Sequence, residues 1–211
     1  MSKYLEFYAK VVLEKLFGYQ NLQISDKPDL QNVKGSIGIE VTSSIQKEQH
    51  EIESLYSQGK EIKCSKLIRR GDDFMPEIRE GIIQNGILIG FSEGNSFANV
   101  NEAYDLKCEK LSQGNYKSFK RYELFIESDI LANDKMLKEE LKYLCSEYLN
   151  SPTRYEKIFV SVPGYIYIFN LVNNEYSHQK INQEIQYWIA EEAKRQMEQH
   201  NKTKEDTITK F

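Results

Sequence analysis

The chain has 211 residues, of which 40% are hydrophobic and 28% are charged, so it has the composition of an ordinary globular protein and the length for one well-buried α/β domain. Its net charge of −4 at pH 7 excludes a generally basic protein that coats nucleic acid, but it does not exclude a local basic groove. The three cysteines are widely spaced and the three histidines are scattered, which predicts reduced thiols and no zinc cluster. The sequence has no signal-peptide pattern and no apolar stretch of membrane length, so we expect a cytoplasmic protein without membrane contact.

The first half of the chain is predicted to begin with an amphipathic helix and to continue into strands. Leucine, valine and alanine recur at helical spacing in the first segment, and a glycine ends that pattern. Further on, isoleucine and valine alternate with small or polar residues, which is typical of a strand with one buried face. The elements expected here are a helix over 3–17, strands over 21–24 and 36–45, a polar helix over 46–70 and a short buried strand over 86–91.

The second half is predicted to alternate between helices and strands, and a Pro-Gly pair between two apolar runs indicates a hairpin. The elements expected here are a helix over 98–112, a strand over 122–126, a helix over 134–149, hairpin strands over 158–162 and 165–171, and a helix over 180–198. This order predicts a single α/β domain over residues 1–200, with a mixed central sheet flanked by helices. Residues 201–211 are expected to form a flexible C-terminal tail.

Two acidic residues stand out by their surroundings. Asp29 follows Pro28 in a turn, and Glu40 lies inside the β-branched apolar run Ile39-Glu40-Val41-Thr42. Two carboxylates on neighbouring strands can converge on one hard divalent cation such as Mg²⁺ or Mn²⁺. Such a cation would neutralise the charge that develops when a phosphodiester is cleaved, and it would lower the pKa of an attacking water. The alternative for each residue is structural, since a turn aspartate commonly bonds its local backbone and a strand glutamate can face solvent.

Pro28-Asp29, the gap of eleven residues and Glu40 together resemble the PD-(D/E)xK superfamily of nucleases, whose motif is Pro-Asp, a variable gap and Asp/Glu-x-Lys. The resemblance covers residues 3–126 and implies a restriction endonuclease-like core of the order α-β-β-β-α-β, followed here by a C-terminal hairpin and helix. It implies metal-dependent hydrolysis of phosphodiester bonds in nucleic acid. It also implies that Asp29, Glu40 and the backbone carbonyl of Val41 are the ligands of Mg²⁺ or Mn²⁺.

The chain departs from this motif at Thr42, which stands where the superfamily usually has lysine. A neutral hydroxyl cannot stabilise a phosphorane as an ammonium would. Some branches of the superfamily look like a glutamate-bearing helix, then Pro-Asp, then Ile-Glu-Val-Thr, with lysines on a later helix. This resemblance implies that Glu6 is the initial glutamate and that Lys107 or Lys110, which share a helix face, supplies the ammonium. The alternatives are that these three are solvated charges, and that the fold is kept as an inactive module that binds nucleic acid or a protein partner.

Two groups of basic residues are candidates for contacts with nucleic-acid phosphates. The first group would form one stripe on a helix, and aromatic residues that suit base stacking are interleaved with the second. The first group is Lys63, Lys66 and Arg70, and the second is Lys117, Lys120 and Arg121 with Tyr116, Phe119 and Tyr122. The basic stripe can also be a solvated face, and the rings can be the core side of the following strand. Many members of the superfamily dimerise, so a homodimer is a further possibility.

A serine-based hydrolase is the weakest alternative. Gly94-Asn95-Ser96 follows an apolar run and precedes a helix, which is the setting of a nucleophile elbow, with His178 or His200 as the base. The chain is short for an α/β-hydrolase, and a helix N-cap is the better account of Ser96 or Asn99. No Gly-Lys-Ser/Thr follows the nearby glycines, which excludes a Walker phosphate-binding loop.

Overall fold

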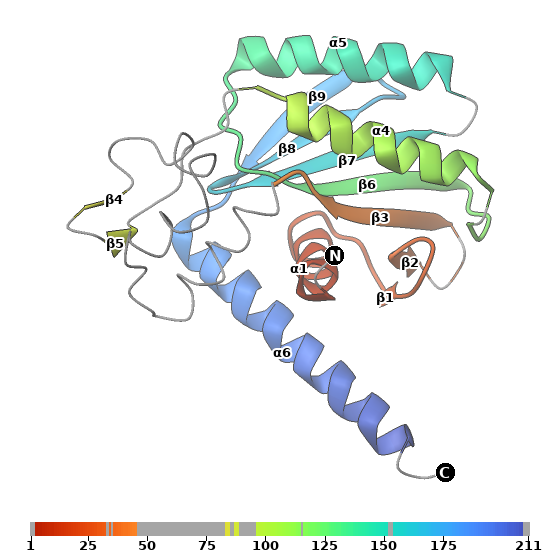
Figure 1. The fold of residues 1–211 in the computed structure, drawn as a ribbon, viewed down its shortest axis with the longest axis vertical. Coiled ribbons are helices and arrows are strands. Elements are labelled where there is room, and N and C mark those ends of the chain that lie inside the picture. Colours follow the sequence, from red (N-terminus) through yellow and green to blue (C-terminus); the bar gives the residue numbers. More distant parts are fainter. Residues whose placement is uncertain are drawn as a thin grey trace, which may run out of the picture.

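A computed structural model describes residues 3–32, 34, 36–45, 96–114, 116–151 and 154–208, with side chains as far as residue 203, and it describes only the backbone of 83–84 and 87–88 between residues 46 and 95. In these residues the chain forms a seven-stranded mixed sheet with helices on both faces (Figure 1). The predicted α/β class, with a mixed central sheet flanked by helices, is therefore confirmed. None of the described helices is long and apolar enough to cross a bilayer.

The strands of the main sheet lie in the order β1-β2-β3-β6-β7-β8-β9. Their bounds are β1 Leu22–Ile24, β2 Leu30–Asn32, β3 Ile37–Ser43, β6 Arg121–Glu127, β7 Tyr155–Val162, β8 Tyr165–Asn170 and β9 Glu175–Lys180. The central strands β3, β6 and β7 are parallel, whereas the outer neighbours pair antiparallel. Because parallel neighbours need a crossover, α4 (Ala98–Ser112) connects toward β6, and α5 (Asp134–Asn150) links β6 to β7.

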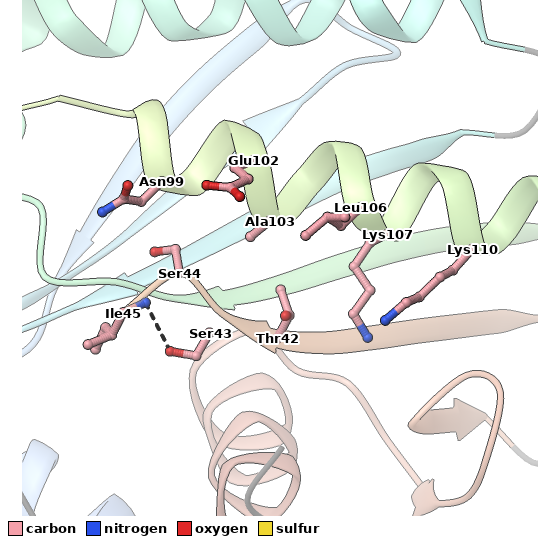
Figure 2. A pocket seen from close by; sticks show the side chains of 10 residues that line it. All are labelled: Thr42, Ser43, Ser44, Ile45, Asn99, Glu102, Ala103, Leu106, Lys107 and Lys110. Carbon is pink, nitrogen blue, oxygen red and sulfur yellow. Dashed lines mark hydrogen bonds between the residues drawn. The ribbon is translucent and has the colours of Figure 1, made fainter. Parts of the chain in front are cut away.

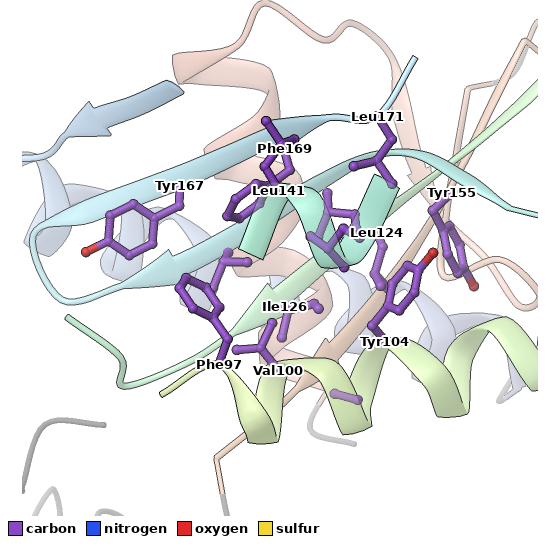
Figure 3. Close-up of a cluster of buried hydrophobic side chains, with 14 of the residues drawn as sticks. Phe97, Val100, Tyr104, Leu124, Ile126, Leu141, Tyr155, Tyr167, Phe169 and Leu171 are labelled. Carbon is purple, nitrogen blue, oxygen red and sulfur yellow. The ribbon is translucent and has the colours of Figure 1, made fainter. Parts of the chain in front are cut away.

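Each face of the sheet has its own hydrophobic core. On β6, Leu124 and Ile126 pack with α4 and α5, and Figure 3 shows this cluster, whereas Phe125 packs with α1 (Lys3–Leu16) and α6 (Gln183–Ile208). A strand covered on both faces is apolar on both, which accounts for the unbroken Leu-Phe-Ile run. On β3, Ile39 and Val41 face the α1 side. Because successive side chains alternate, Glu40 and Thr42 face α4, and this alternation places the candidate site.

Most predicted elements are present with bounds close to those expected. The helix over 98–112 coincides with α4, and α1, α5, β3, β6 and the hairpin of β7 and β8 also lie where they were predicted. The predicted strand over 21–24 is β1. The predicted cap of α4 is wrong, because the N-cap residue is Phe97 and no side chain caps this helix end.

The remaining differences have physical reasons. The three-residue strand β2 is too short to carry a hydrophobic pattern, and β9 is polar and mostly exposed along its length, so neither was predicted. The last helix continues to Ile208, so residues 201–208, predicted as part of a flexible tail, are helical. The predicted helix over 46–70 lies outside the described residues. Of the predicted strand over 86–91, Ile87–Leu88 (β5) pairs with Ile83–Gln84 (β4) in a separate two-stranded sheet.

Candidate functional site

Asp29 lies at the point where β2 begins, and its side chain takes the place of a missing strand partner. The last residue of β3 that β2 pairs with is Ile39, so β2 does not pair with the backbone of β3 beyond it. The carboxylate of Asp29 accepts a hydrogen bond from the backbone N–H of Val41, with 2.9 Å between nitrogen and Oδ2. This bond holds the Asp29 carboxylate beside β3, close to Glu40, the residue that precedes Val41.

Glu40 is buried, with only 2% of its surface exposed, because its strand is packed between α1 and α4. Its side chain points into the layer between β3 and α4, opposite Leu124 of β6. Carboxylates are rarely buried unless they are paired. The partner in this layer is a lysine from α4.

Lys107 is that partner, and it contacts both carboxylates. Its ammonium nitrogen lies 2.5 Å from Oε2 of Glu40 and 3.7 Å from Oδ2 of Asp29. The lysine points inward because Ala103 and Leu111, one turn before and one turn after it, are buried on the same face of α4. Of the two lysines predicted as alternatives, Lys107 is therefore the one that meets the acidic pair.

Lys110 lies one turn further along α4 and is exposed. Figure 2 shows its side chain running in the same direction as that of Lys107, toward β3. No ion pair in the described part of the chain joins Lys110 to either carboxylate, in contrast to Lys107.

Three further side chains complete the surroundings of this group. Tyr116, in the loop after α4, is hydrogen-bonded to Glu40 through its phenol. Tyr155 of β7 donates a hydrogen bond to the backbone carbonyl of Lys107 at 3.2 Å, which fixes the turn of α4 that carries this lysine. Glu6, in the first turn of α1, interacts electrostatically with Asp29 and Lys107, so the predicted initial glutamate lies near the site.

The site carries more negative than positive charge. Burial raises the pKa of Asp29, Glu40 and Glu6, and the Asp29 carboxylate further raises the pKa of the other two. Lys107 lowers the pKa of all three, but one ammonium faces three carboxylates. A divalent cation would relieve this repulsion, so the donor set fits one in charge and in its oxygen chemistry.

The side chains that the structure describes can supply only part of a metal's coordination shell. Among the described residues, no group of three or more His, Cys, Asp or Glu side chains stands close enough to hold a metal ion. Magnesium usually keeps several waters and is bound through one or two carboxylates and substrate phosphates. Asp29 and Glu40 match that smaller requirement.

A pocket of about 270 Å³ lies beside Lys107, between the C-terminal end of β3 and the inner face of α4 (Figure 2). Its walls combine hydroxyls, an amide, a carboxylate, two ammonium groups and three apolar side chains. It is lined by Thr42, Ser43, Ser44, Ile45, Asn99, Glu102, Ala103, Leu106, Lys107 and Lys110.

The second predicted basic group lies on the loop before β6, close to the Pro28-Asp29 turn. The backbone N–H of Lys117 donates to the carbonyl of Lys27 at 3.2 Å, which joins the two loops. Phe119 is buried against Gly38, which agrees for this ring with the alternative that it belongs to the core and does not stack on bases. Lys120 and Arg121 are exposed, and Arg121 pairs with the buried Glu123 at 3.3 Å. The first predicted group, Lys63, Lys66 and Arg70, lies outside the described residues.

Sequence reasoning considered Tyr116 only as a ring that could stack on bases, and it gave Tyr155 no role. Tyr116 contacts Glu40 and Tyr155 contacts the backbone of Lys107 only because α4 packs on the sheet, and no local pattern indicates either contact. A scan against protein-family models, a search of curated proteins and a search of solved structures each give no match. The geometry of the site is therefore the basis for any functional conclusion.

Proposed function

We propose that the protein is a metal-dependent nuclease with a PD-(D/E)xK-like core. The elements α1, β1, β2, β3, α4 and β6 supply the order α-β-β-β-α-β, with β4 and β5 falling between β3 and α4 in the sequence. Asp29 immediately precedes β2 and Glu40 lies within β3, which supports the assignment of both to the motif. The hairpin of β7 and β8, then β9 and α6, follow this core.

The observation that carries the proposal is the ammonium of Lys107 between the two motif carboxylates. Thr42, which occupies the usual lysine position, lines the pocket beneath α4. The lysine of the helix can therefore supply the charge that the strand lacks. A strand glutamate that faced solvent, or a turn aspartate that bonded only its local backbone, would not share a cation from a third element.

Asp29, Glu40 and the backbone carbonyl of Val41 would hold Mg²⁺ or Mn²⁺. The N–H of Val41 points to the side of β3 where Asp29 lies, and the N–H and C=O of one strand residue point to the same neighbour. A carboxylate offers about four acceptor sites on its two oxygens, so contact with Lys107 leaves room for a cation. When bound, the metal would neutralise charge on the phosphate and lower the pKa of a bound water.

Three side chains near the metal ligands, Lys107, Glu6 and Tyr116, would have separate roles in the reaction. Lys107, held by two carboxylates, stabilises negative charge on the non-bridging oxygens of the phosphate as the phosphorane forms. Glu6 is partly buried and interacts electrostatically with Asp29 and Lys107, so it can accept a hydrogen bond from the attacking water. Tyr116 fixes the carboxylate of Glu40 through its phenol.

Cleavage assays with DNA and RNA in Mn²⁺ or Mg²⁺ test the proposal. Asp29→Asn and Glu40→Gln keep the shape of each side chain, and Lys107→Met keeps the apolar stem while removing the charge. Each change is expected to reduce the cleavage rate by about 10²-fold or more, the usual cost of losing one electrostatic contact in a transition state. Lys138→Ala, an exposed lysine on α5, is the matched control and should cleave like the unmodified chain.

Cleavage that persists in Asp29→Asn and Glu40→Gln would rule out the assignment. If the protein binds nucleic acid without cleaving it under any of these conditions, the second function becomes the better account. That function is a catalytically inactive module that binds nucleic acid or a protein partner, and it is favoured by Thr42 at the lysine position.

A further inference from the structure

The pocket between β3 and α4 opens directly beside the candidate catalytic group, since Lys107 is part of its wall. Its volume of about 270 Å³ is slightly below the 300–1,000 Å³ typical of pockets for drug-sized ligands. One small polar unit fits this space, whereas a nucleic-acid duplex does not. Thr42 lines this pocket with a short side chain. The lysine that the motif usually has at this position is longer and would take up part of the pocket volume.

The two lysines at one end of the pocket are not equivalent. The charge of Lys107 is matched by Asp29 and Glu40. No carboxylate in the described part of the chain forms an ion pair with Lys110, although its side chain lines the same pocket (Figure 2). An ammonium that lines a pocket without a protein counter-ion is suited to an anionic ligand, and phosphate is the anion that the neighbouring site would handle.

The other end of the pocket has the opposite character. Glu102 and Asn99 lie one to three turns before the lysines on α4, and Figure 2 shows both on the side of the helix that borders the pocket. A carboxylate repels a phosphate but accepts hydrogen bonds from the hydroxyls of a sugar, as it does in dinucleotide-binding sites. The ligand that matches both ends has a phosphate at one end and sugar hydroxyls at the other.

We propose that this pocket binds one ribonucleotide unit of the substrate, with its phosphate on Lys110 and its sugar hydroxyls on Glu102 and Asn99. This inference rests on the proposed nuclease function. It gives Lys110 a binding role, in contrast to the catalytic role of Lys107, and it makes the 2′-hydroxyl a feature that the site can recognise.

Calorimetric titration of the metal-free protein tests the pocket separately from cleavage. The probes are inorganic phosphate, adenosine 5′-monophosphate and its 2′-deoxy form. We expect the ribonucleotide to bind most tightly, and Lys110→Ala to weaken all three probes by about tenfold or more, the usual cost of a lost charge-assisted hydrogen bond. Glu102→Gln should bind inorganic phosphate as well as the unmodified chain does, or more tightly, and should lose the preference for the ribonucleotide.

The outcomes separate this inference from the nuclease proposal. Asp29→Asn, which should reduce cleavage by about 10²-fold or more, is expected to bind inorganic phosphate at least as tightly as the unmodified chain does, and Lys138→Ala should bind like the unmodified chain. If the chain cleaves nucleic acid but Lys110→Ala changes neither phosphate affinity nor KM, the pocket assignment is wrong and the nuclease proposal stands. If the unmodified chain binds none of the probes at millimolar concentration, the pocket assignment is likewise refuted. A ribonucleotide preference that survives Glu102→Gln refutes the sugar-binding role of that residue.

Discussion

Replacing Glu140 with glutamine tests a buried acid–amide pair that joins α5 to α4. Glu140 is 4% exposed, and Asn101 of α4 donates from Nδ2 to its Oε2 at 3.4 Å. The other two polar atoms of the pair, Oε1 of Glu140 and Oδ1 of Asn101, are buried and have no hydrogen-bond partner within the described residues. A proton on Oε1 could be donated to Oδ1, so the protonated acid can satisfy both atoms at once.

The size of the effect follows from the pKa of this carboxyl. The pKa of Glu140 is raised from 4.5 to about 7, chiefly because the carboxyl is buried; the Asn101 hydrogen bond opposes this rise, and the nearby Asp105 adds to it. Because one pKa unit corresponds to about 1.4 kcal/mol, ionised Glu140 costs the fold about 3 kcal/mol. A raised pKa in the folded state means that stability is full below pH 4.5 and falls as the pH rises through 7. Glutamine carries no charge and can make both hydrogen bonds to Asn101 at every pH.

Chemical denaturation of both proteins between pH 5 and pH 8 measures this difference. We expect Glu140→Gln to be more stable by about 3 kcal/mol at pH 8 and by less than about 1 kcal/mol at pH 5. In a melting experiment at pH 8 the gain corresponds to roughly 6–12 °C for a chain of this length. Glu139→Gln is the matched control, since Glu139 is exposed and pairs only loosely with Lys135 at 3.9 Å, so its stability should not change. Equal stability of Glu140→Gln and the unmodified chain at pH 8 would refute the reasoning.

Three further predictions concern the site and its support. Gly38→Ala should lower the free energy of unfolding by about 1–3 kcal/mol in denaturation, because its methyl group would lie 2.6 Å from the ring of Pro28; unchanged stability would contradict the tight packing there. Mn²⁺ at about a hundred times its dissociation constant should raise the free energy of unfolding by about 3 kcal/mol at pH 8, and by less at low pH, where the carboxylates bind protons. Thermal melting measures this gain, which Asp29→Asn should lack. Tyr116→Phe removes a donor that lowers the pKa of Glu40, so the acid limb of a cleavage pH profile should shift to higher pH, and an unshifted profile would argue against the contact.

The sequence was most informative where chemistry and pattern coincide. The alternation of apolar and polar residues around Glu40 predicted its strand. The Pro28-Asp29 pair predicted a turn whose carboxylate lies near Glu40. The spacing of Lys107 and Lys110 left open which lysine faces the site. Ala103 and Leu111, one turn to either side of Lys107, are buried, whereas Leu106, one turn before Lys110, is exposed. A helix with leucines on two faces gives a weak pattern, so only its packing on the sheet decides between them.

Other features depend on contacts between distant segments and had no local signal. The strand β9 is polar and mostly exposed, so its place at the sheet edge follows from pairing with β8 and not from hydrophobicity. Tyr116 reaches Glu40 only because the loop before β6 is bonded to the Pro28 turn. The pairing of Asn101 with Glu140 likewise arises when α4 and α5 pack side by side on one face of the sheet (Figure 1).

The position of the lysine on α4 has a consequence for how the site is assembled. A lysine on β3 would share its strand with Glu40 and would be in place as soon as that strand is paired. Lys107 instead reaches the carboxylates from a crossover helix, so the charge balance of the site depends on the docking of α4 onto the sheet. That docking is fixed near the lysine by the bond from Tyr155 to its carbonyl, and nearer the start of the helix by the pair of Asn101 with Glu140. Removing the charge of Lys107 while α4 stays docked would leave Asp29 and Glu40 buried without their counter-ion, which is costly, so the same contact that supports the proposed chemistry also stabilises the fold.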